Sequence, residues 1–481
     1  SEYFEGSRKV FDMVLEPLGT DFQQKVWSTL MNIPYSKTIT YLELANSAVG
    51  KKLFAAMGLP EPVVLDREDA AQPHVLSGEV LIGSAEGSRF ADQIKHFLQA
   101  AEVQVVDSVV GQRGHLIFDA SGIASAEQST ELYEFFHQNI KFLKPCGRVI
   151  VVGLKASATD TIDHGTVQRG LQGFVKSLAK EIGRNGATAN LLLVEKGGEA
   201  SIDAPVRFML SAGSAFMNAQ LLTAASPVTP VEGDWRRPLM GKMLVVTGAA
   251  RGIGLAIAEV LSRDGAIVIG VDIPQAEEEL TSNMRRLGGL ALALDITSDG
   301  AETLLRDFCA AQTSSLHGIV HNAGITRDKM LSRMSEQQWN MLMQVNLGSV
   351  QRINAALLET DLLDNGGKII GVASISGIAG NRGQTNYGFS KSAIIGMVET
   401  LAEPCAARGI TVNGVAPGFI ETQMTAAIPF VTRQMGRRLS SLGQGGLPID
   451  VAEVIGFFVS PQAAGINGNL VRVCGQSLLG A

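Results

Sequence analysis

Apolar positions in the second half of the chain fall into short runs rich in β-branched residues, separated by longer stretches with helical spacing. The short runs occupy residues 243–247, 266–272, 318–324, 367–374, 410–418 and 469–475. Apolar runs of this length are typical of strands that are buried on both faces of a parallel sheet. Because the runs alternate with amphipathic helical stretches, the pattern predicts a doubly wound α/β domain.

The same pattern occurs a second time upstream, in runs at residues 79–85, 103–109, 115–122, 147–153 and 188–194. When Gly186 is aligned with Gly409, the preceding helical stretches match and Asn190 falls on Asn413. Chance similarity between amphipathic helices is the alternative, and the shared order of strand, helix and strand argues against it. We therefore predict an α/β protein with two doubly wound parallel-sheet domains in tandem, of Rossmann or flavodoxin-like type.

Three prolines interrupt the pattern between residues 226 and 242, at Pro227, Pro230 and Pro238. Proline removes a backbone donor and forces the preceding residue into an extended conformation, so neither a helix nor a central strand is expected there. The predicted organisation is a separate segment at 1–45, a first α/β domain at 46–225, a linker at 226–241 and a second α/β domain at 242–481.

Composition narrows the classes of function. The 481 residues are 46% hydrophobic and 18% charged, which is typical of a globular protein. The formal net charge of −7 argues against nucleic acid as the main partner. The four cysteines are isolated, so neither a disulfide framework nor a metal site is expected. With no apolar run of about 18 residues and no signal-peptide pattern, we expect a cytoplasmic protein without a membrane segment.

A glycine-rich sequence, TGAARGIG, runs from Thr247 to Gly254 between a predicted strand and a predicted helix. Glycines at this junction let the backbone turn sharply and approach a pyrophosphate, whose charge then lies at the positive end of the helix. The spacing GxxxGxG differs from the general fingerprint GxGxxG. The strand context favours a variant dinucleotide loop over a plain strand–helix connection, and its members are Gly248, Arg251, Gly252, Ile253 and Gly254.

Asp272 ends the next predicted strand, about 20 residues after the first glycine. A carboxylate at this position accepts hydrogen bonds from the ribose hydroxyl groups of NAD(H) and repels the 2′-phosphate of NADP(H). Asp272 therefore predicts a preference for NAD(H) over NADP(H). Two alternatives stay open, namely Asp272 as an ordinary turn or capping residue and Arg251 as a ligand of a 2′-phosphate.

Tyr387 and Lys391 lie four residues apart on a predicted helix and so share one face. A nearby ammonium favours phenolate, so we expect Lys391 to lower the pKa of Tyr387 towards the value that a general acid needs. Ser374 ends a predicted strand, where its hydroxyl can hold a carbonyl oxygen, and Asn346 is a polar residue within a helical stretch. A solvated helix face explains Tyr387 and Lys391 alone, but not the whole set in this order after a nucleotide loop.

With these residues, the chain from about 241 to 481 resembles the short-chain dehydrogenase/reductase family along its whole length. The resemblance rests on TGxxxGIG at 247–254, NAG at 322–324, YxxxK at 387–391 and PG at 417–418. Within the family the chain is similar to the 3-oxoacyl-(acyl-carrier-protein) reductases, and its duplication is similar to their high-molecular-weight members. The resemblance implies further cofactor contacts from Asp295, Ile296, Asn322, Ala323, Gly324, Tyr387, Lys391, Pro417, Gly418 and Thr422. His321 departs from the family, which usually has asparagine there.

The resemblance also implies a mechanism in which hydride passes from a nicotinamide to the C3 ketone of an acyl thioester. Tyr387 would protonate the forming alkoxide, Ser374 would hold the oxygen, Lys391 would bind the ribose, and Asn346 would hold a relay water. The expected function is NADH-dependent reduction of a 3-oxoacyl thioester of CoA or acyl-carrier protein by a homodimer or higher homo-oligomer. The alternative is a 3-hydroxyacyl-CoA, polyol or other secondary-alcohol dehydrogenase on the same site.

The first α/β domain lacks these groups. In the duplication register, Tyr387 and Lys391 fall on His164 and Gln168, and alignment of the strand ends at Gly147 and Gly367 puts Leu154 opposite Ser374. The second and third glycines of the phosphate loop are missing as well. We therefore expect this domain to bind no dinucleotide and to catalyse nothing; a flavin site is the alternative, and no phosphate loop supports it.

Residues 1–45 resemble the segment of O6-alkylguanine-DNA alkyltransferases that leads into their DNA-binding domain. The resemblance rests on GTxFQxxVW at 19–27 and on IPYxxT at 33–38. The nucleophilic cysteine of that family lies in a PCHR motif, whereas Cys146 here precedes Gly147, so no histidine activates the thiol. We expect a fusion segment or remnant, with a DNA-binding or repair module as the remote alternative.

Overall fold

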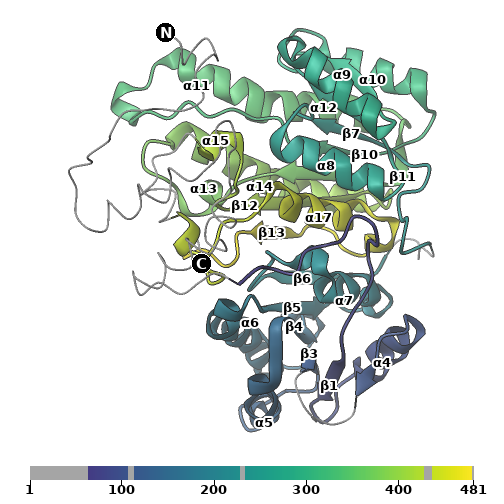
Figure 1. Ribbon diagram of the computed structural model, residues 1–481, viewed down its shortest axis with the longest axis vertical. Helices are drawn as coiled ribbons and strands as arrows, with labels where there is room; N and C mark the ends of the chain where they lie inside the picture. Colours follow the sequence, from purple (N-terminus) through teal and green to yellow (C-terminus); the bar gives the residue numbers. More distant parts are fainter. Residues whose placement is uncertain (1–62, 107–112, 228–232, 427–435, 479–481) are drawn as a thin grey trace, which may run out of the picture. The chain divides into compact units, whose positions relative to one another are not determined.

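The computed structural model describes residues 63–106, 113–227, 233–426 and 436–478 (Figure 1). The chain divides into two compact units, residues 1–64 and 65–481. The structure described below belongs to the second unit, which contains two parallel sheets. The alkyltransferase-like segment at residues 1–45 lies outside the described residues.

The first sheet has six parallel strands in the order β2-β1-β3-β4-β5-β6. Its strands are β1 (Val80–Ser84), β2 (Val105–Val106), β3 (Arg113–Asp119), β4 (Leu143–Leu154), β5 (Thr188–Val194) and β6 (Leu221–Ala224). Its helices are α4 (Ala91–Ala100), α5 (Ser129–Asn139), α6 (Ile162–Ile182) and α7 (Asp203–Leu210). Apolar residues of α4 and α7 pack in one hydrophobic cluster and those of α5 and α6 in another, so the two pairs cover opposite faces of the sheet.

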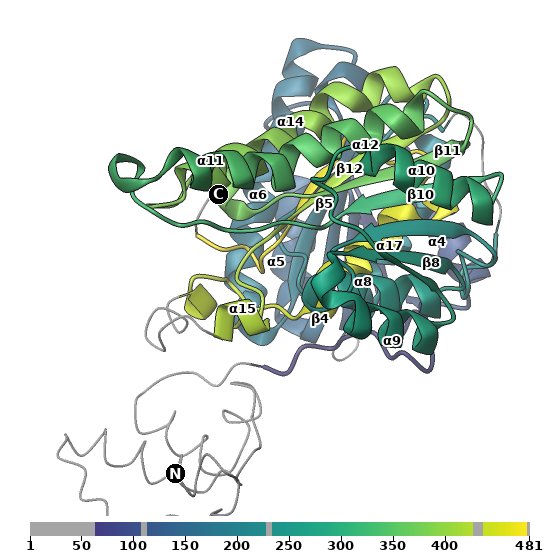
Figure 2. The ribbon, with the colours of Figure 1, turned by 90° about the horizontal axis from the view of Figure 1, so that it is seen from above.

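The second sheet has seven parallel strands in the order β13-β12-β11-β10-β7-β8-β9. Its strands are β7 (Met243–Thr247), β8 (Ile267–Asp272), β9 (Leu290–Ala293), β10 (Leu316–His321), β11 (Leu363–Val372), β12 (Thr411–Pro417) and β13 (Leu470–Val473). Its helices are α8 (Gly252–Arg263), α9 (Glu277–Leu287), α10 (Ala301–Gln312), α11 (Glu336–Met343), α12 (Ser349–Leu358), α13 (Ile375–Ala379), α14 (Thr385–Ala406), α15 (Gln423–Ala426) and α17 (Pro448–Val459). Figure 2 shows α8, α9 and α17 on one side of this sheet and α10, α12 and α14 on the other.

The fold class predicted from the apolar runs is confirmed. Every run named above contains a strand, although β2 spans only two residues. Sequence reasoning missed β6 and β9, which are four residues long with the sequences LLTA and LALA. Alanine and leucine favour helices in isolation, so neighbouring strands rather than local preference make these segments extended.

The two sheets share one strand connectivity, in which β1 to β6 correspond in order to β7, β8, β10, β11, β12 and β13. The pairing register shifts after Arg113 in β3 and after Leu316 in β10, which are equivalent places. Asn190 and Asn413 are also equivalent, because each side chain accepts a hydrogen bond from the backbone N–H just before the edge strand. These shared details agree with the internal duplication inferred from the sequence.

The first copy of the duplicated domain contains β1 to β6 and the second contains β7 to β13. The two copies pack against each other through equivalent helices, α7 and α17. The rings of Phe208 and Phe457 stack with their centroids 4.5 Å apart and their planes 5° from parallel. When the two helices are aligned on their last residues, Leu210 and Val459, these two phenylalanines are the same position. A residue that stacks on its own equivalent marks a pseudo-two-fold axis, as in a dimer built from one repeated surface.

The edge strands β6 and β13 lie side by side at this interface (Figure 1) and make reciprocal contacts. The side-chain oxygen of Gln220 accepts a hydrogen bond from the N–H of Arg472 (2.8 Å). The side-chain oxygen of Asn469 accepts one from the N–H of Thr223 (2.8 Å). Gln220 corresponds to Asn469 and Thr223 to Arg472, so the two hydrogen bonds are related by the same pseudo-two-fold axis.

No helix in the described parts of the chain is long and apolar enough to span a membrane. Across the same residues, no three His, Cys, Asp or Glu side chains form a group that could hold a metal ion. The described end of the linker, residues 233–242, contains neither helix nor strand, as its prolines predict.

Equivalent basic residues in the central strands differ in their surroundings. Arg148 in β4 is 2% exposed, and its guanidinium donates to the carbonyl oxygens of Ser211, Cys146 and Asp66. Lys368 in β11 is 1% exposed, and among the described residues its Nζ has no hydrogen-bond partner. Burial lowers the pKa of Lys368 to about 7. The charged form of Lys368 therefore opposes folding.

We expect Lys368→Met to raise the free energy of unfolding by about 2–4 kcal/mol at pH 6. The pKa of Lys368 is lower in the folded state than in the unfolded state. The free-energy cost of burying its ammonium is therefore complete below about pH 7 and decreases as the pH rises towards 10.5. Urea unfolding of the variant and the wild-type protein at pH 6 and pH 9 measures the difference in their free energies of unfolding, which should be smaller at pH 9. The exposed Lys180→Met serves as control, with a change within about 0.5 kcal/mol. A variant no more stable than the parent at pH 6 would contradict the prediction.

Candidate active site

The glycine loop joins β7 to α8, where the sequence predicted it. Gly248 and Gly252 adopt φ values of +69° and +61°, in the left-handed region that favours glycine. At Gly254 a Cβ would lie 1.9 Å from the carbonyl oxygen of Gly248, so only glycine fits there. Arg251 precedes α8 without a side-chain cap, and Ile253 lies in its first turn. The first N–H groups of a helix have no partner within it, which suits this end of α8 to a phosphate group.

Asp272, at the end of β8, is held against the glycine loop. Its carboxylate accepts hydrogen bonds from the N–H groups of Ala250 and Ile273, each at 2.9 Å. Arg251 turns towards Glu279 of α9, with Nη1 and Oε2 3.8 Å apart. The carboxylate of Asp272 therefore lies at the position that the sequence predicts for recognition of a ribose.

Asp295 and Ile296 follow β9, the neighbour of β8. The N–H of Leu294 donates to the carbonyl of Asp272 (2.8 Å), which places this connection beside the end of β8. Ile296 is 8% exposed, whereas Asp295 is exposed and accepts hydrogen bonds from Thr297. These two residues, which the resemblance implies as cofactor contacts, thus lie next to Asp272.

Asn322, Ala323 and Gly324 form the turn after β10 and are bonded to the glycine loop. Asn322 Nδ2 donates to the carbonyl oxygens of Thr247 (3.0 Å) and Gly248 (3.2 Å). The hydroxyl of Thr247 accepts from the N–H groups of Asn322 and Ala323. The predicted loop and turn are therefore one hydrogen-bonded unit, organised by Thr247, which sequence reasoning did not single out.

His321 precedes this turn, at the position where the sequence departs from the family. The imidazole is 4% exposed, and its Nε2 lies 2.8 Å from Oδ1 of Asn354 on α12. Burial lowers the pKa of His321 to about 4. His321 is thus a neutral core residue bonded to α12.

Asn346 lies in a one-turn π-helix, Gln344–Gly348, between α11 and α12. Its Oδ1 accepts from the N–H of Ile325 (2.8 Å), and its Nδ2 donates to the carbonyl of Ile325 (3.1 Å). Nδ2 also donates to the hydroxyl of Ser390 (3.1 Å). Because a π-bulge turns side chains out of the regular helical order, it explains how a residue of this helix reaches the strand ends.

Tyr387, Lys391 and Ser374 come together from α14 and the N-terminus of α13. The hydroxyl of Ser374 accepts from the N–H of Ser376 (3.1 Å), which leaves its own proton free to donate. Lys391 is 5% exposed, and its Nζ donates to the carbonyl of Val372 (2.7 Å). The same Nζ lies 5.8 Å from the centroid of the Tyr387 ring. The shared helix face predicted for Tyr387 and Lys391 is thus present.

The predicted direction of the Tyr387 pKa shift is wrong. Burial raises the pKa of Tyr387 above its ordinary value, the carboxylate of Asp328 adds to this, and the hydroxyl of Ser374 offsets part of it. Burial also lowers the pKa of Lys391 to about 8. The ammonium of Lys391 lies 5.8 Å from the ring centroid and is bonded to a backbone carbonyl, so desolvation of the phenol outweighs its attraction.

Ser390, like Thr247, is a site residue that sequence reasoning missed. It is fully buried, accepts from Nδ2 of Asn346 (3.1 Å) and donates to the carbonyl of Tyr387 (2.9 Å). Ser390 therefore ties the π-helix to the helix that carries the phenol. The sequence feature that could have identified Ser390 is a small polar residue directly before Lys391, on the buried side of a predicted helix.

Pro417 ends β12, and Gly418 and Thr422 follow it. The N–H of Gly418 donates to the carbonyl of Val473 (2.9 Å), and a Cβ on Gly418 would lie 2.5 Å from that of Cys474. The N–H of Thr422 donates to the hydroxyl of Thr425 (2.8 Å) at the start of α15. The end of β12 is thus fixed against β13. Residues 418–422 continue from that end of the strand.

These residues lie where the strands of the second sheet end. A Cβ at Gly324 would lie 3.4 Å from both Oδ1 of Asn346 and Nζ of Lys391, so Gly324 borders both groups. A glycine loop at the start of a helix, a carboxylate at the end of the next strand and the buried ammonium of Lys391 fit a nicotinamide dinucleotide. In open parallel α/β sheets, such ligands bind outside the carboxyl ends of the strands.

The equivalent place in the first copy is filled by the protein itself. Asp119 corresponds to Asn322 and is fully buried. Its carboxylate accepts from the N–H groups of Phe90 (2.6 Å), Ala91 (2.9 Å) and Ser121 (3.0 Å). The start of α4 therefore already holds an anion where α8 offers a phosphate site, and the ring of Phe90 stands in the position of Gly254.

The positions of the catalytic side chains in the first copy are used for packing. Gln168, in the place of Lys391, donates to the carbonyls of Ala120 (2.7 Å) and Ile123 (2.9 Å) and accepts from the N–H of Leu154 (2.7 Å). Leu154 itself is 3% exposed in the place of Ser374. Gln168 thus spends its hydrogen bonds on backbone groups, and Leu154 offers no polar group.

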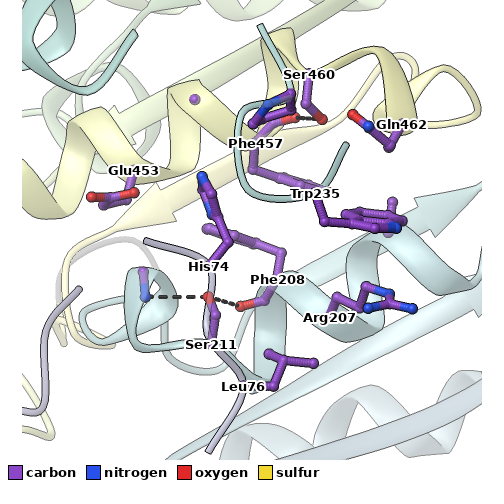
Figure 3. A pocket seen from close by; sticks show the side chains of 14 residues that line it. His74, Leu76, Arg207, Phe208, Ser211, Trp235, Glu453, Phe457, Ser460 and Gln462 are labelled. Carbon is purple, nitrogen blue, oxygen red and sulfur yellow. Dashed lines mark hydrogen bonds between the residues drawn. The ribbon is translucent and has the colours of Figure 1, made fainter. Parts of the chain in front are cut away.

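A separate cavity of about 60 Å³ lies between α7 and α17 (Figure 3). In Figure 3 the hydroxyl groups of Ser211 and Ser460 bond to the carbonyls of Phe208 and Phe457, which repeats the pseudo-two-fold symmetry of the interface. This volume holds only a few water molecules. The cavity is a packing space between the copies, distinct from the open site at Tyr387.

A doubly wound domain with a glycine loop and a Ser–Tyr–Lys set at its strand ends defines a nicotinamide-dependent oxidoreductase. A family model described as enoyl-(acyl carrier protein) reductase matches residues 248–475. The chain belongs, through this half, to the short-chain dehydrogenase/reductase family.

Similar proteins include the 3-oxoacyl-[acyl-carrier-protein] reductases FabG of Vibrio cholerae and Escherichia coli. The Vibrio protein is 41% identical over 241 residues, which is 49% of this chain and 97% of the relative. The Escherichia coli protein is 39% identical over 235 residues, which is 49% of this chain and 96% of the relative. The similarity therefore covers nearly the whole of each relative and the second half of this chain.

We expect the full-length protein to bind one NADH per chain, because the first copy fills its own phosphate position. Titration calorimetry measures the stoichiometry directly. Gly254→Ala should abolish binding, since the added methyl would collide with the carbonyl of Gly248. Two NADH molecules per chain, or binding that survives Gly254→Ala, would show that the first copy is a nucleotide site.

Proposed function

We propose that the protein reduces the ketone of a 3-oxoacyl thioester, carried by acyl-carrier protein or CoA, to the 3-hydroxyacyl thioester with NADH. The observation that carries this proposal is the convergence of the Tyr387 phenol, the Ser374 hydroxyl and the buried ammonium of Lys391 at one open edge of the sheet. The names of the relatives, which are 3-oxoacyl-[acyl-carrier-protein] reductases, support the choice of substrate.

The bound NADH would supply the hydride. Ser374 donates a hydrogen bond from its hydroxyl to the ketone oxygen, while one lone pair of the same hydroxyl accepts from the N–H of Ser376. Tyr387 gives its proton to the oxygen as negative charge develops there, and a phenol with a raised pKa remains protonated at neutral pH. Preorganised donors of this kind stabilise a developing oxyanion more than they stabilise the ketone.

Lys391 and Asn346 support that proton transfer. The ammonium of Lys391 lies beside the opening at Gly324, where it can bond to the nicotinamide ribose and attract the developing phenolate. The amide of Asn346 is fixed by Ile325 and Ser390 and borders the same opening, which suits it to hold a relay water. Holding reacting groups in place lowers the barrier because less ordering remains to be done during the reaction.

The NADH preference rests on Asp272. The carboxylate is held at the end of β8 by two backbone N–H groups, and a 2′-phosphate at that place would meet its negative charge. Arg251, the side chain that could neutralise a 2′-phosphate, is directed towards Glu279. Both contacts favour NAD(H) over NADP(H).

We also propose a homo-oligomer. The side chain of Phe389 on α14 is 56% exposed and its ring lies 5.9 Å from that of Trp339 on α11, while Met341 of α11 is 38% exposed. Apolar side chains gathered on neighbouring helices favour contact with another molecule of this protein. Light scattering that shows a strict monomer at micromolar concentration would exclude this assembly.

We expect Tyr387→Phe to lower kcat for acetoacetyl-CoA by about 10³-fold, because the variant removes the donated proton and keeps the ring. Absorbance at 340 nm measures the rate, with acetoacetyl-acyl-carrier protein as a second substrate. NADH binding, measured by calorimetry, should be retained and serves as the control for folding. Turnover that persists in the variant would contradict the assignment of Tyr387.

The same assay separates the alternative reactions. Oxidation of 3-hydroxybutyryl-CoA or another secondary alcohol by NAD⁺, without reduction of either thioester, would identify a dehydrogenase on this site. Reduction of crotonoyl-CoA would identify the carbon–carbon double bond that the name of the family model describes. In either case the wild-type protein would bind NADH but leave the ketone of acetoacetyl-CoA unchanged.

We expect Asp272→Asn to change the ratio of kcat/KM for NADH to that for NADPH by about 10-fold or more in favour of NADPH. The amide keeps an oxygen that can accept from Ala250 and removes the charge that would repel a 2′-phosphate. Asp299→Asn, an exposed loop variant, is the matched control. A wild-type preference for NADPH, or an unchanged ratio in the variant, would overturn the cofactor proposal.

A further inference from the structure

One contact between the two copies breaks the pseudo-two-fold symmetry. Phe208, Gln220 and Thr223 each contact the second copy through a residue related by the axis. Phe216 does not follow this rule, because its equivalent in the second copy is Gly465. The first copy thus inserts a large aromatic side chain at a place where the second copy inserts none.

Phe216 is 1% exposed and enters the second copy between two glycines. A Cβ at Gly446 would lie 2.6 Å from the ring, and a Cβ at Gly475 would lie 3.0 Å from it. The N–H of Gly475 also donates to the carbonyl of Phe216 (3.1 Å). The catalytic copy therefore has two positions without side chains, and the ring of Phe216 fills the space beside them.

Gly446 connects this ring to the segment after Pro417. The N–H of Gly446 donates to the carbonyl of Phe419 (3.0 Å), and the N–H of Glu421 donates to the carbonyl of Gly446 (2.8 Å). Ile420 pairs with Gly446 in a parallel bridge and belongs to the same hydrophobic cluster as Phe216. Gly446 thus lies between the ring of Phe216 and the backbone that leads to Thr422.

A second bridge from the first copy reaches the same region. Gln476, which adopts φ +58°, donates from Nε2 to the carbonyl of Lys176 in α6 (2.6 Å). The Oε1 of Gln476 accepts from the hydroxyl of Ser441 (2.8 Å). Ser441 lies in the segment that leads to Gly446, so the first copy holds this segment from two sides.

We propose that Phe216 of the non-catalytic copy is a positioning residue for the cofactor-binding segment 417–422 of the catalytic copy. The inference rests on the proposed function only in taking Gly418 and Thr422 as cofactor contacts. Phe216 touches neither substrate nor cofactor and acts through Gly446 on Ile420 and Glu421. The first copy is then a part of the active site's support, although it carries no chemistry itself.

The test is Phe216→Leu in the full-length chain, compared with Phe118→Leu. Phe118 is 2% exposed and packs against Phe135 and Phe136 in the cluster on the other face of the first sheet. Both variants remove the same atoms from a buried place, so both should lower the melting temperature. Only Phe216→Leu is expected to weaken NADH binding, by about 10-fold in calorimetry.

A double-mutant cycle with Gly446→Ala tests the route. The added methyl would meet the ring of Phe216, so Gly446→Ala alone should also weaken NADH binding. Combined with Phe216→Leu, which removes ring atoms at that place, the loss should be smaller than the product of the single effects. This variant also keeps the proposal testable if Phe216→Leu fails to fold.

NADH affinity unchanged in Phe216→Leu, or weakened equally in Phe118→Leu, would overturn the proposal, as would independent effects in the cycle. These measurements use binding and need no turnover. If the thioesters are not reduced but the cycle behaves as described, the proposed function fails and the positioning role stands. If the thioesters are reduced and the cycle shows no coupling, the proposed function stands and the positioning role of Phe216 fails.

Discussion

The candidate active site depends on the parallel pairing of β7, β10, β11 and β12, which brings the ends of four separate segments to one edge of a sheet. Parallel strands of the same direction deliver the glycine loop, the NAG turn, Ser374 and Pro417 within reach of one another. Side chains at Gly248 or Gly254 would break this convergence, because the loop lies against Asn322 and against its own first residue. The backbone is thus the scaffold, and the polar side chains occupy the space that the glycines leave open.

The chain contains a natural comparison for this arrangement, since the first copy has the same connectivity and no comparable site. Its sheet edge is closed by Asp119, whose carboxylate satisfies the N-terminus of α4, and by Gln168, which bonds to three backbone groups. Both copies bury polar groups at the same positions. In the catalytic copy, burial without full compensation lowers the pKa of Lys391 to about 8, whereas the first copy satisfies its groups internally. Function in this fold therefore depends on polar groups that packing leaves partly unsatisfied.

The strands, the glycine loop and the order of Asn346, Ser374, Tyr387 and Lys391 could be predicted because they are local patterns in the sequence. The short strands β6 and β9 could not, since their neighbours in the sheet decide their conformation. The pKa of Tyr387 was predicted in the wrong direction for a related reason. Helical spacing shows that Lys391 shares a face with Tyr387, but the depth of burial and the bond from Lys391 to Val372 depend on residues far away in the chain. The role of Ser390 depends in the same way on its contact with Asn346.

Because both sides belong to one chain, the pseudo-two-fold interface has a property that a true dimer lacks. In a symmetric dimer, a residue that improves one side of the interface occurs on both sides, so every change must suit two environments. Here Phe216 and Gly465 occupy equivalent positions and differ completely in size. The two halves are parts of one chain, so each side of the interface can differ from the other. The ring of Phe216 against Gly446 and Gly475 is such a one-sided difference, and Gly446 is bonded to the backbone of Phe419 and Glu421, which leads to Thr422.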